Sequence, residues 1–326
     1  MKTSRNLLVC SFLIVSAAVL FFGCGSSDDD PNTQQTDYEA GLQFFEMTWE
    51  NRIRTYQVYF PEERFSENAL PLLFVLHGGG GDATGLIEGT FGRFNELADI
   101  HGFIVVYPEG FEKQWNDGRG ANGLGTTWDE NIDDVGFISE IVRRLQSDFT
   151  IDENYIFTSG ISNGGFMSSR LLCDRSDIFK GGAIITATLP DNYLSSCNPT
   201  NPTSVIVMNG TEDPLVPYEG GQITILGQER GLIVSTDAYM QFWANANGCE
   251  STPMVTDLPD TEDDGTTVQV YEYPSCNGQA SVQLYRIEGG GHTWPSGQEL
   301  LSEVLVGRTS KEFVACDVIW DFFNGL

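Results

Sequence analysis

A hexapeptide near the middle of the chain constrains the fold more than any other segment. Residues 160–165 read Gly-Ile-Ser-Asn-Gly-Gly and match the pattern G-x-S-x-G. They follow a segment with the apolar character of a strand, 155–159, and open a helical pattern over 165–173. A tight strand–turn–helix corner crowds the backbone around its central serine, so glycine is needed two positions away on either side. The pattern predicts Ser162 as an exposed nucleophile, with a purely structural turn as the alternative.

Strand-like and helix-like segments alternate along the rest of the chain. Most expected strands are apolar on both faces, which is typical of strands buried between helices. The first two, 44–49 and 55–60, instead predict an antiparallel hairpin with its turn at Glu50-Asn51. The alternation predicts an α/β fold with a mostly parallel central sheet and helices on both faces. The other expected strands are 72–76, 103–107, 155–159, 182–187, 204–208, 268–273 and 282–287, and the expected helices are 91–97, 134–145, 165–173, 235–246 and 309–323.

A serine hydroxyl needs a base to take its proton, and the chain has three histidines. His292 lies on a glycine-rich loop, 289–295, directly after a predicted strand and late in the chain. His101 stands at a helix end before a strand, where a solvated loop residue is expected. His77 begins a run of glycines. These positions indicate His292 as the general base.

The base in turn needs a carboxylate that fixes its tautomer and stabilises its charged form. Asp213 follows a predicted strand and could also be an ordinary turn residue. Glu212 is its nearest rival. The order Ser162, Asp213, His292 is the chain order of α/β-hydrolase triads, which favours Asp213.

A tetrahedral intermediate also needs hydrogen-bond donors for its oxyanion. The backbone N–H of Asn163, directly after the nucleophile, is the first candidate. The second should come from the turn after the strand 72–76, which is the run His77–Gly81. Glycines leave that backbone open to approach, and the N–H of Gly79 is the expected donor. As a phosphate loop the run lacks a following Lys-Ser/Thr, which argues against nucleotide binding.

Charge and composition narrow the range of partners. The chain has 46 acidic and 17 basic residues and a formal net charge of −29. It therefore has no surplus of Lys or Arg for phosphates, which argues against nucleic acid and against docking on anionic lipid. No metal is expected, because no C-x-x-C motif occurs and histidines are few. The acidic stretch 260–265 lacks the final Glu of a calcium loop and is expected to be a solvated turn.

The first residues predict export from the cytoplasm. Two basic residues precede an apolar run of about 16 residues, 7–22, which is short for a spanning helix and typical of a signal-peptide core. The run ends at Gly23-Cys24, which resembles a bacterial lipoprotein cleavage site. Ordinary secretion with cleavage near Gly25 is the alternative.

The chain is therefore divided into a lipoprotein signal peptide over 1–23, a flexible acidic tether over 24–41 and a catalytic domain over 42–326. Cys24 would carry the lipid, so membrane contact is expected only through that N-terminal anchor. An acidic run behind a lipidated cysteine resembles the surface-export signal of some Gram-negative lipoproteins, with a plain solvated linker as the alternative. The expected location is secreted or cell-surface, as an outer-membrane lipoprotein.

Five cysteines remain once the leader and the lipidation site are set aside. Export makes disulfides plausible. Nearest-neighbour pairing predicts Cys173–Cys197 and Cys249–Cys276, each closing a loop of about 25 residues. Cys316, among apolar residues of the last predicted helix, is expected to be a buried inert thiol.

Together these pieces resemble the extracellular esterase family that includes poly(3-hydroxybutyrate) depolymerase-like enzymes, feruloyl esterases and acetylxylan esterases. The resemblance implies the α/β-hydrolase fold, a Ser-His-Asp esterase without a cofactor, and a bridge between Cys249 and Cys276. The chain departs from the family pattern at Asn209, where histidine is frequent, although His292 still completes the triad. The matching segments, which together cover nearly all of residues 45–326, are His77–Gly81, Tyr107–Gly110, Trp115–Gly120, Asp133–Phe137, Ser159–Phe166, Asp213–Tyr218, Trp243–Cys249 and Gly289–Pro295.

Three tryptophans are candidates for binding the substrate. About 40 residues separate Cys173 from Asp213, which leaves no room for a large lid, and an open cleft suits a polymer. Trp294, two residues after the base, could stack on a sugar or aromatic ring. Trp115 and Trp128, at the two ends of a glycine-rich loop, could form the cleft wall. Core packing is the alternative for each.

The sequence thus predicts a serine carboxylesterase acting on feruloyl or acetyl esters of plant polysaccharide. A polyester substrate such as polyhydroxybutyrate is the first alternative. The second is a serine peptidase on the same fold, although such enzymes often carry a large gating domain that this chain has no residues to build. The third is a non-catalytic surface binding protein on a hydrolase scaffold.

Overall fold

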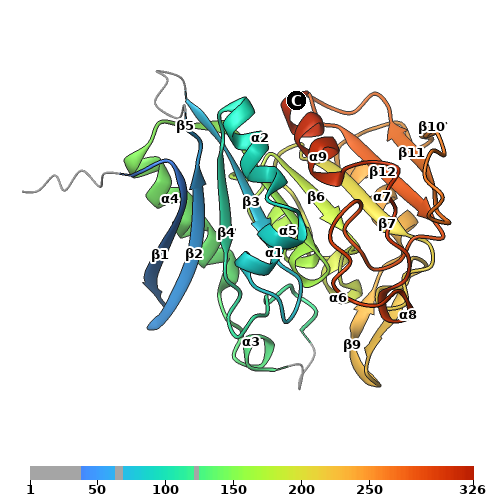
Figure 1. Cartoon of the computed structure of the whole chain (residues 1–326), viewed down its shortest axis with the longest axis horizontal. Helices are drawn as coiled ribbons and strands as arrows, with labels where there is room; N and C mark the ends of the chain where they lie inside the picture. The colour runs from blue at the N-terminus through green and yellow to red at the C-terminus, as the bar shows by residue number, and fades with distance from the viewer. Residues whose placement is uncertain (1–37, 63–68, 121–124) are drawn as a thin grey trace, which may run out of the picture. The chain divides into compact units, whose positions relative to one another are not determined.

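The computed structural model describes residues 38–62, 69–120 and 125–326 (Figure 1). Within these ranges, no helix combines the length and the apolar composition needed to cross a membrane. The predicted signal peptide, the predicted lipidation site Cys24 and the tether residues up to 37 lie outside the described residues.

The compact unit of the structure begins slightly before residue 42, the expected start of the catalytic domain. Tyr38 opens a compact unit that runs to Leu326. Its ring packs against three aromatic rings, and the first strand begins at Gly41. Residues 38–41 of the predicted tether therefore belong to the domain, because this aromatic cluster holds their start. The three rings are those of Phe45, Phe60 and Phe149.

In the described residues, ten strands form one sheet in the order β1-β2-β4-β3-β5-β6-β7-β12-β11-β10. The inner strands β4, β3, β5, β6, β7 and β12 run parallel, and the pairs at both edges are antiparallel. This confirms the predicted mostly parallel sheet. The strands are β1 (Gly41–Trp49), β2 (Arg52–Phe60), β3 (Leu70–Leu76), β4 (Ile104–Pro108), β5 (Ile151–Ile161), β6 (Gly181–Ile185), β7 (Ser204–Gly210), β10 (Met254–Asp257), β11 (Thr267–Tyr273) and β12 (Val282–Glu288), with β8 (Gly221–Ile225) and β9 (Gln228–Ile233) as a separate pair.

Helices cover both faces of the sheet, as the alternation predicted (Figure 1). One core cluster joins the sheet to α4, α5 and α7, and the other joins it to α1, α2 and α9. The strands β3, β4, β6 and β7 are buried on both faces and are therefore mostly apolar. The helices are α1 (Ala83–Gly89), α2 (Arg93–His101), α3 (Thr126–Asp129), α4 (Asp134–Asp148), α5 (Asn163–Asp174), α6 (Asp191–Leu194), α7 (Thr236–Ala246), α8 (Glu303–Val306) and α9 (Ala315–Asn324).

The predicted opening hairpin is confirmed, and its turn explains the register. Glu50 and Asn51 both have positive φ, 47° and 61°. Two left-handed residues make the type I′ turn whose twist matches that of paired strands. The turn pairs Trp49 with Arg52 and sets a ladder that runs to Gly41 and Phe60.

The last predicted helix, 309–323, is wrong in its first part, because α9 begins at Ala315. The preceding residues are irregular and are hydrogen-bonded to the loop that carries His292. Ser310 and Phe313 carbonyls accept hydrogen bonds from the Ser296 backbone and side chain. These tertiary hydrogen bonds replace the helical ones that the apolar spacing suggested.

Both predicted disulfides are present. Cys173 is bonded to Cys197, and Cys249 is bonded to Cys276. Cys316 is a free, buried thiol, as expected, and its burial raises the pKa of the thiol. The first bridge ties the C-terminal end of α5 to the segment after α6.

Candidate active site

Ser162 lies at a sharp corner between β5 and α5. Its φ of 56° and ψ of −121° place a non-glycine residue in a strained conformation. Close backbone contacts explain the glycines around it. A Cβ on Gly160 would lie 2.4 Å from the Gly164 carbonyl oxygen, and a Cβ on Gly164 would lie 2.3 Å from that of Leu76. The corner therefore forms only with glycine at these positions, as the motif predicted.

His292 and Asp213 meet at the same end of the sheet. The His292 Nδ1 atom lies 2.7 Å from Asp213 Oδ2, and both side chains are almost fully buried. The other Asp213 oxygen accepts hydrogen bonds from the backbone N–H groups of Leu215 and Val216, each at 2.8 Å. These contacts hold the carboxylate aimed at the ring. Glu212, the rival considered above, instead pairs with the exposed Arg308.

Ser162 and His292 line one cavity of about 620 Å³. The Nε2 atom of His292 has no hydrogen-bond partner among the described residues, whereas its Nδ1 is held by Asp213. The arrangement therefore presents a hydroxyl and an oriented imidazole to the same space. Such a pair can transfer a proton from the hydroxyl as it attacks a bound carbon.

The predicted oxyanion donors also lie at this cavity. A Cβ on Gly78 would lie 3.5 Å from Ser162 Cβ, so the glycine turn passes directly beside the serine. In that turn the Gly80 and Gly81 N–H groups donate to Lys113 and Gly78 carbonyls. Within the described part of the chain, the N–H groups of Gly79 and Asn163, the two predicted donors, make no hydrogen bond. Both are thus available to an oxygen in the cavity.

His77 is excluded as a second base. Burial lowers the pKa of His77 from 6.5 to about 4, so the ring is neutral near pH 7. Its Nε2 accepts the N–H of Gly110 at 3.0 Å, which places the ring proton on Nδ1. That proton is donated to the Gly78 carbonyl at 2.8 Å.

The prediction for Trp115 is wrong. Its side chain is 0 % exposed and does not line the cavity. The indole N–H donates to the His77 carbonyl at 2.9 Å instead. Trp128 and Trp294 do line the cavity, although both are largely buried, and Trp294 packs edge-on against Phe94. Their role in binding stays a prediction.

The sequence reasoning missed part of one wall, which combines Arg119 with aromatic rings. The Arg119 guanidinium lies 5.6 Å from the Trp128 ring and 5.0 Å from the Phe166 ring. It also forms an ion pair with the buried Asp117 at 2.6 Å. The motif Trp115–Gly120 was the available sign of this wall, but spacing alone could not show that the arginine turns inward. Ile223, Ile225, Leu215 and Val216 extend this wall, and Leu86, Leu300, Leu301 and Val306 also line the cavity.

Fold and site geometry define the class of molecule as an α/β-hydrolase. The solved structure of acetyl xylan esterase from Aspergillus awamori superimposes with a TM-score of 0.56 at 15% identity, covering 87% of this chain and 100% of that chain. Residues 99–189, which include the serine corner, match the model of the prolyl oligopeptidase family.

Among named proteins, the similarity is to esterases. NocK of Nocardia uniformis subsp. tsuyamanensis, whose name describes it as an esterase, is 28% identical over 287 residues, covering 86% of this chain and 82% of that protein. Feruloyl esterase B of Piromyces equi is 27% identical over 247 residues, covering 74% of this chain but only 43% of that protein. The chain is a carboxylic-ester hydrolase, and the resemblance to esterases of this kind is confirmed.

Proposed function

We propose that the chain cleaves esters by a Ser-His-Asp acyl-enzyme mechanism. Ser162 Oγ attacks the acyl carbon while His292 Nε2 takes its proton, and the N–H groups of Gly79 and Asn163 hold the oxyanion. The protonated His292 then gives the proton to the departing alcohol. Water, activated by the same ring, releases the acid and restores the serine. The hydrogen bond from His292 to Asp213, at the cavity that Ser162 lines, is the observation that carries this proposal.

The proposed substrate is an aromatic acyl ester of plant polysaccharide, of the feruloyl type. A cavity of about 620 Å³ is far larger than an acetyl group needs. The Trp128 and Phe166 rings can stack on a planar acyl group. Arg119 adds N–H donors, and its ion pair with Asp117 offsets the positive charge of its guanidinium. A neutral oxygen, such as a ring hydroxyl or methoxy group, fits such donors better than a carboxylate does.

One observation favours a polyester as the second candidate. Aliphatic side chains stand exposed on two segments that contribute residues to the cavity wall. Leu226 is 96 % exposed at the tip of the β8–β9 hairpin, and Val304 is 93 % exposed in α8. An apolar polymer surface could rest on them, whereas sugar rings usually meet aromatic side chains.

The test compares three esters with the wild-type enzyme, Ser162→Ala and Arg119→Met. Methyl ferulate and methyl cinnamate differ only in the oxygen substituents of the ring, and p-nitrophenyl acetate reports the basal activity. We expect Ser162→Ala to abolish all three activities. Arg119→Met should lower the ferulate-to-cinnamate ratio of kcat/KM about tenfold, since one hydrogen bond between a charged donor and a neutral oxygen is lost. A ratio is insensitive to any general loss of activity that unpairing Asp117 causes.

Each outcome separates the candidates. An unchanged ratio would remove the role given to Arg119 and leave the triad intact. Activity on the acetate alone would favour an acetyl ester, and clearing of a polyhydroxybutyrate film would favour the polyester. Cleavage of a peptide anilide at a higher kcat/KM than any ester would favour the peptidase. Full activity of Ser162→Ala on every ester would refute the mechanism, and an inert wild type would favour the binding protein.

We further propose that the chain is exported as a lipoprotein anchored through Cys24. The two disulfides support an oxidising compartment. Metabolic labelling with palmitate should mark the wild type and not Cys24→Ser. Labelling of both proteins, or of neither, would remove the anchor from the proposal.

A further inference from the structure

The side chain of Asn163 makes contacts that the proposed mechanism does not use. Asn163 is 3 % exposed, and its backbone N–H is one of the two oxyanion donors proposed above. The side-chain oxygen accepts the N–H of Trp115 at 2.8 Å. The side-chain nitrogen donates to the Trp115 carbonyl at 3.0 Å and to Asp117 Oδ2 at 2.6 Å. The amide thus pairs with the Trp115 backbone as a neighbouring strand would.

Trp115 continues this connection to the other donor. Its indole N–H donates to the His77 carbonyl at 2.9 Å. The His77 ring in turn donates to the carbonyl of Gly78, the residue before the Gly79 donor. The start of α5 also lies against this turn, since a Cβ on Gly164 would lie 2.5 Å from the His77 carbonyl oxygen. One continuous set of hydrogen bonds therefore joins the two segments that carry the donors.

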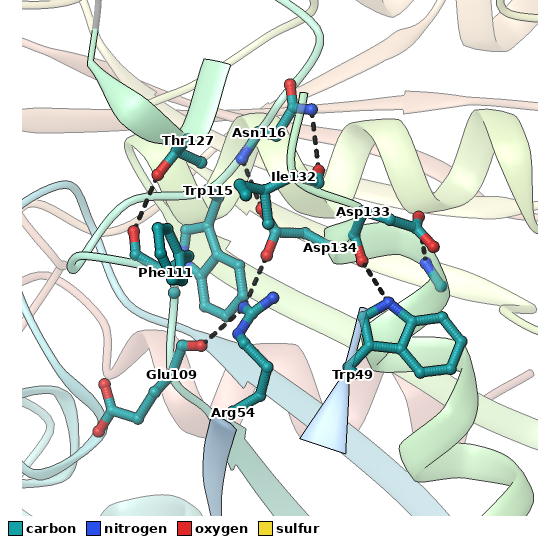
Figure 2. Close-up of polar contacts among 12 residues, drawn as sticks. Trp49, Arg54, Glu109, Phe111, Trp115, Asn116, Thr127, Ile132, Asp133 and Asp134 are labelled. Atoms are coloured by element: carbon teal, nitrogen blue, oxygen red, sulfur yellow. Dashed lines mark hydrogen bonds and ion pairs between the residues drawn. The ribbon is translucent and has the colours of Figure 1, made fainter. Parts of the chain in front are cut away.

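The middle of this connection is itself held in place (Figure 2). The backbone N–H of Asn116 donates to Asp134 at 2.7 Å, and its side chain donates to the Ile132 carbonyl at 2.9 Å. Asp134 also accepts from Arg54 at 2.6 Å, and both of these charged side chains are buried. A segment fixed on several sides can transmit the position of one donor to the other.

We propose that Asn163 is a positioning residue that uses its side chain to set the spacing of the two oxyanion donors through Trp115 and His77. This inference rests on the proposed function. Asn163 then acts twice, once through its backbone N–H and once through its amide. Because the oxyanion forms only in the transition state, a misplaced donor lowers kcat more than it changes KM.

The test is Asn163→Ala, which keeps the backbone N–H and removes the three side-chain hydrogen bonds. On the full chain with p-nitrophenyl acetate, we expect kcat to fall about 10- to 100-fold with KM changed by less than about twofold. The inhibition constant of an alkyl boronic acid, whose adduct with Ser162 places an oxygen in the oxyanion site, should rise by a similar factor. Trp115→Phe removes the indole N–H and part of the buried ring but keeps the backbone groups that pair with Asn163, and should show a smaller loss of the same kind.

The chain offers a matched control for the hydrogen bonds themselves. Asn247 is 1 % exposed and makes the same pair of bonds with the Thr203 backbone, each at 2.8 Å. It follows α7 and does not line the cavity. Asn247→Ala should lower the thermal midpoint about as much as Asn163→Ala and leave kcat within about twofold of the wild type.

The results distinguish this inference from the proposed function. If Asn163→Ala keeps its kcat while Ser162→Ala is inactive, the positioning role is overturned and the triad stands. Equal loss of kcat in Asn247→Ala would assign the effect to stability and overturn the role as well. A rise in KM at constant kcat would make Asn163 a substrate-binding residue instead. If Asn163→Ala fails to fold, an unchanged kcat in Trp115→Phe overturns the connection.

Discussion

The buried ring of His77 is a neutral hydrogen-bonding spacer between two backbone segments. Its Nε2 accepts the N–H of Gly110, and its Nδ1 donates to the Gly78 carbonyl. Protonation would place a second N–H on Nε2, where the Gly110 N–H needs an acceptor. This explains why a histidine at the start of the glycine turn is not the catalytic base. Its chemistry depends on remaining uncharged.

The low pKa of His77 predicts a loss of stability in mild acid. The unfolded chain binds a proton near the ordinary pKa of 6.5, whereas the folded chain binds it only near pH 4. Between these values the unfolded state holds more protons, so the free energy of unfolding falls as pH falls. From about pH 7 to about pH 5 the loss from this group should be about 2 kcal/mol.

Urea unfolding at the two pH values measures this loss, with His77→Gln as the comparison. Glutamine can keep both hydrogen bonds and does not titrate. Carboxylates that lie away from His77 affect both proteins alike, so the wild type should lose about 2 kcal/mol more than the variant. Equal losses would show that His77 does not titrate as described.

The residues of the proposed triad could be singled out from the sequence because each stands in a local pattern of its own. Ser162 has the glycine corner, His292 a late glycine-rich loop, and Asp213 a turn after a buried strand. Trp115 stands in a similar glycine-rich segment and was assigned to the cleft wall in error. Its burial depends on His77 and Asn163, which are distant in sequence, so no local pattern could reveal it.

At the scale of elements, the ion pair between β2 and α4 holds the segment behind the active site. The Arg54 Nη2 atom lies 2.6 Å from Asp134 Oδ1, and the two side chains are 2% and 0% exposed. Asp134 also accepts the N–H of Asn116 (Figure 2). A single carboxylate thus joins a strand, a helix and the loop that supports Trp115.

Asp134→Asn should destabilise the fold by about 3–5 kcal/mol, because it leaves a buried guanidinium without a countercharge. Chemical denaturation gives the change in free energy of unfolding. Glu130→Gln is the control, since Glu130 pairs with Arg52 at the same 2.6 Å but at an exposed site. That change should cost less than about 1 kcal/mol. Similar costs for both variants would contradict the role given to the buried pair.

The elements were predictable where burial imposes a simple pattern. The inner strands were all predicted, since most of them are buried on both faces, although β5 extends from Ile151 to Ile161, beyond the predicted 155–159. The hairpin β8–β9 was missed, because most of its residues are exposed or half-exposed and its two strands form a sheet apart from the main one. The structure of such segments depends on tertiary contacts rather than on a local sequence pattern.

Across the whole molecule, two covalent bonds reinforce the face of the sheet that carries α5 and α7. Cys173 ends the helix that begins beside Ser162, and Cys249 follows α7. The bridges close loops with sequence separations of 24 and 27 residues. The two bridges should therefore lower the entropy of the unfolded chain by nearly equal amounts.

Replacing Cys173 and Cys197 by serine should lower the free energy of unfolding by about 3 kcal/mol, since the unfolded chain regains the entropy of an open loop. Urea denaturation without reductant measures the difference. Adding reductant to this variant should remove a further amount of about 3 kcal/mol from the second bridge. A variant as stable as the wild type would show that the first bridge does not form in solution.

The asparagine side chains that are hydrogen-bonded to backbone groups also affect the chemical degradation of the protein. Asn163, Asn209 and Asn247 each hold a backbone segment through their amide, and a glycine follows each of them. In a flexible chain, Asn-Gly is the dipeptide whose amide is most easily attacked by the next backbone nitrogen, with loss of ammonia. In the native state the three amides are bound to other segments and held away from that attack. Unfolding would release them together, so prolonged heating should form the cyclic imide, which water opens to isoaspartate and aspartate. Inactivation would then be irreversible, and peptide mass spectrometry can follow it.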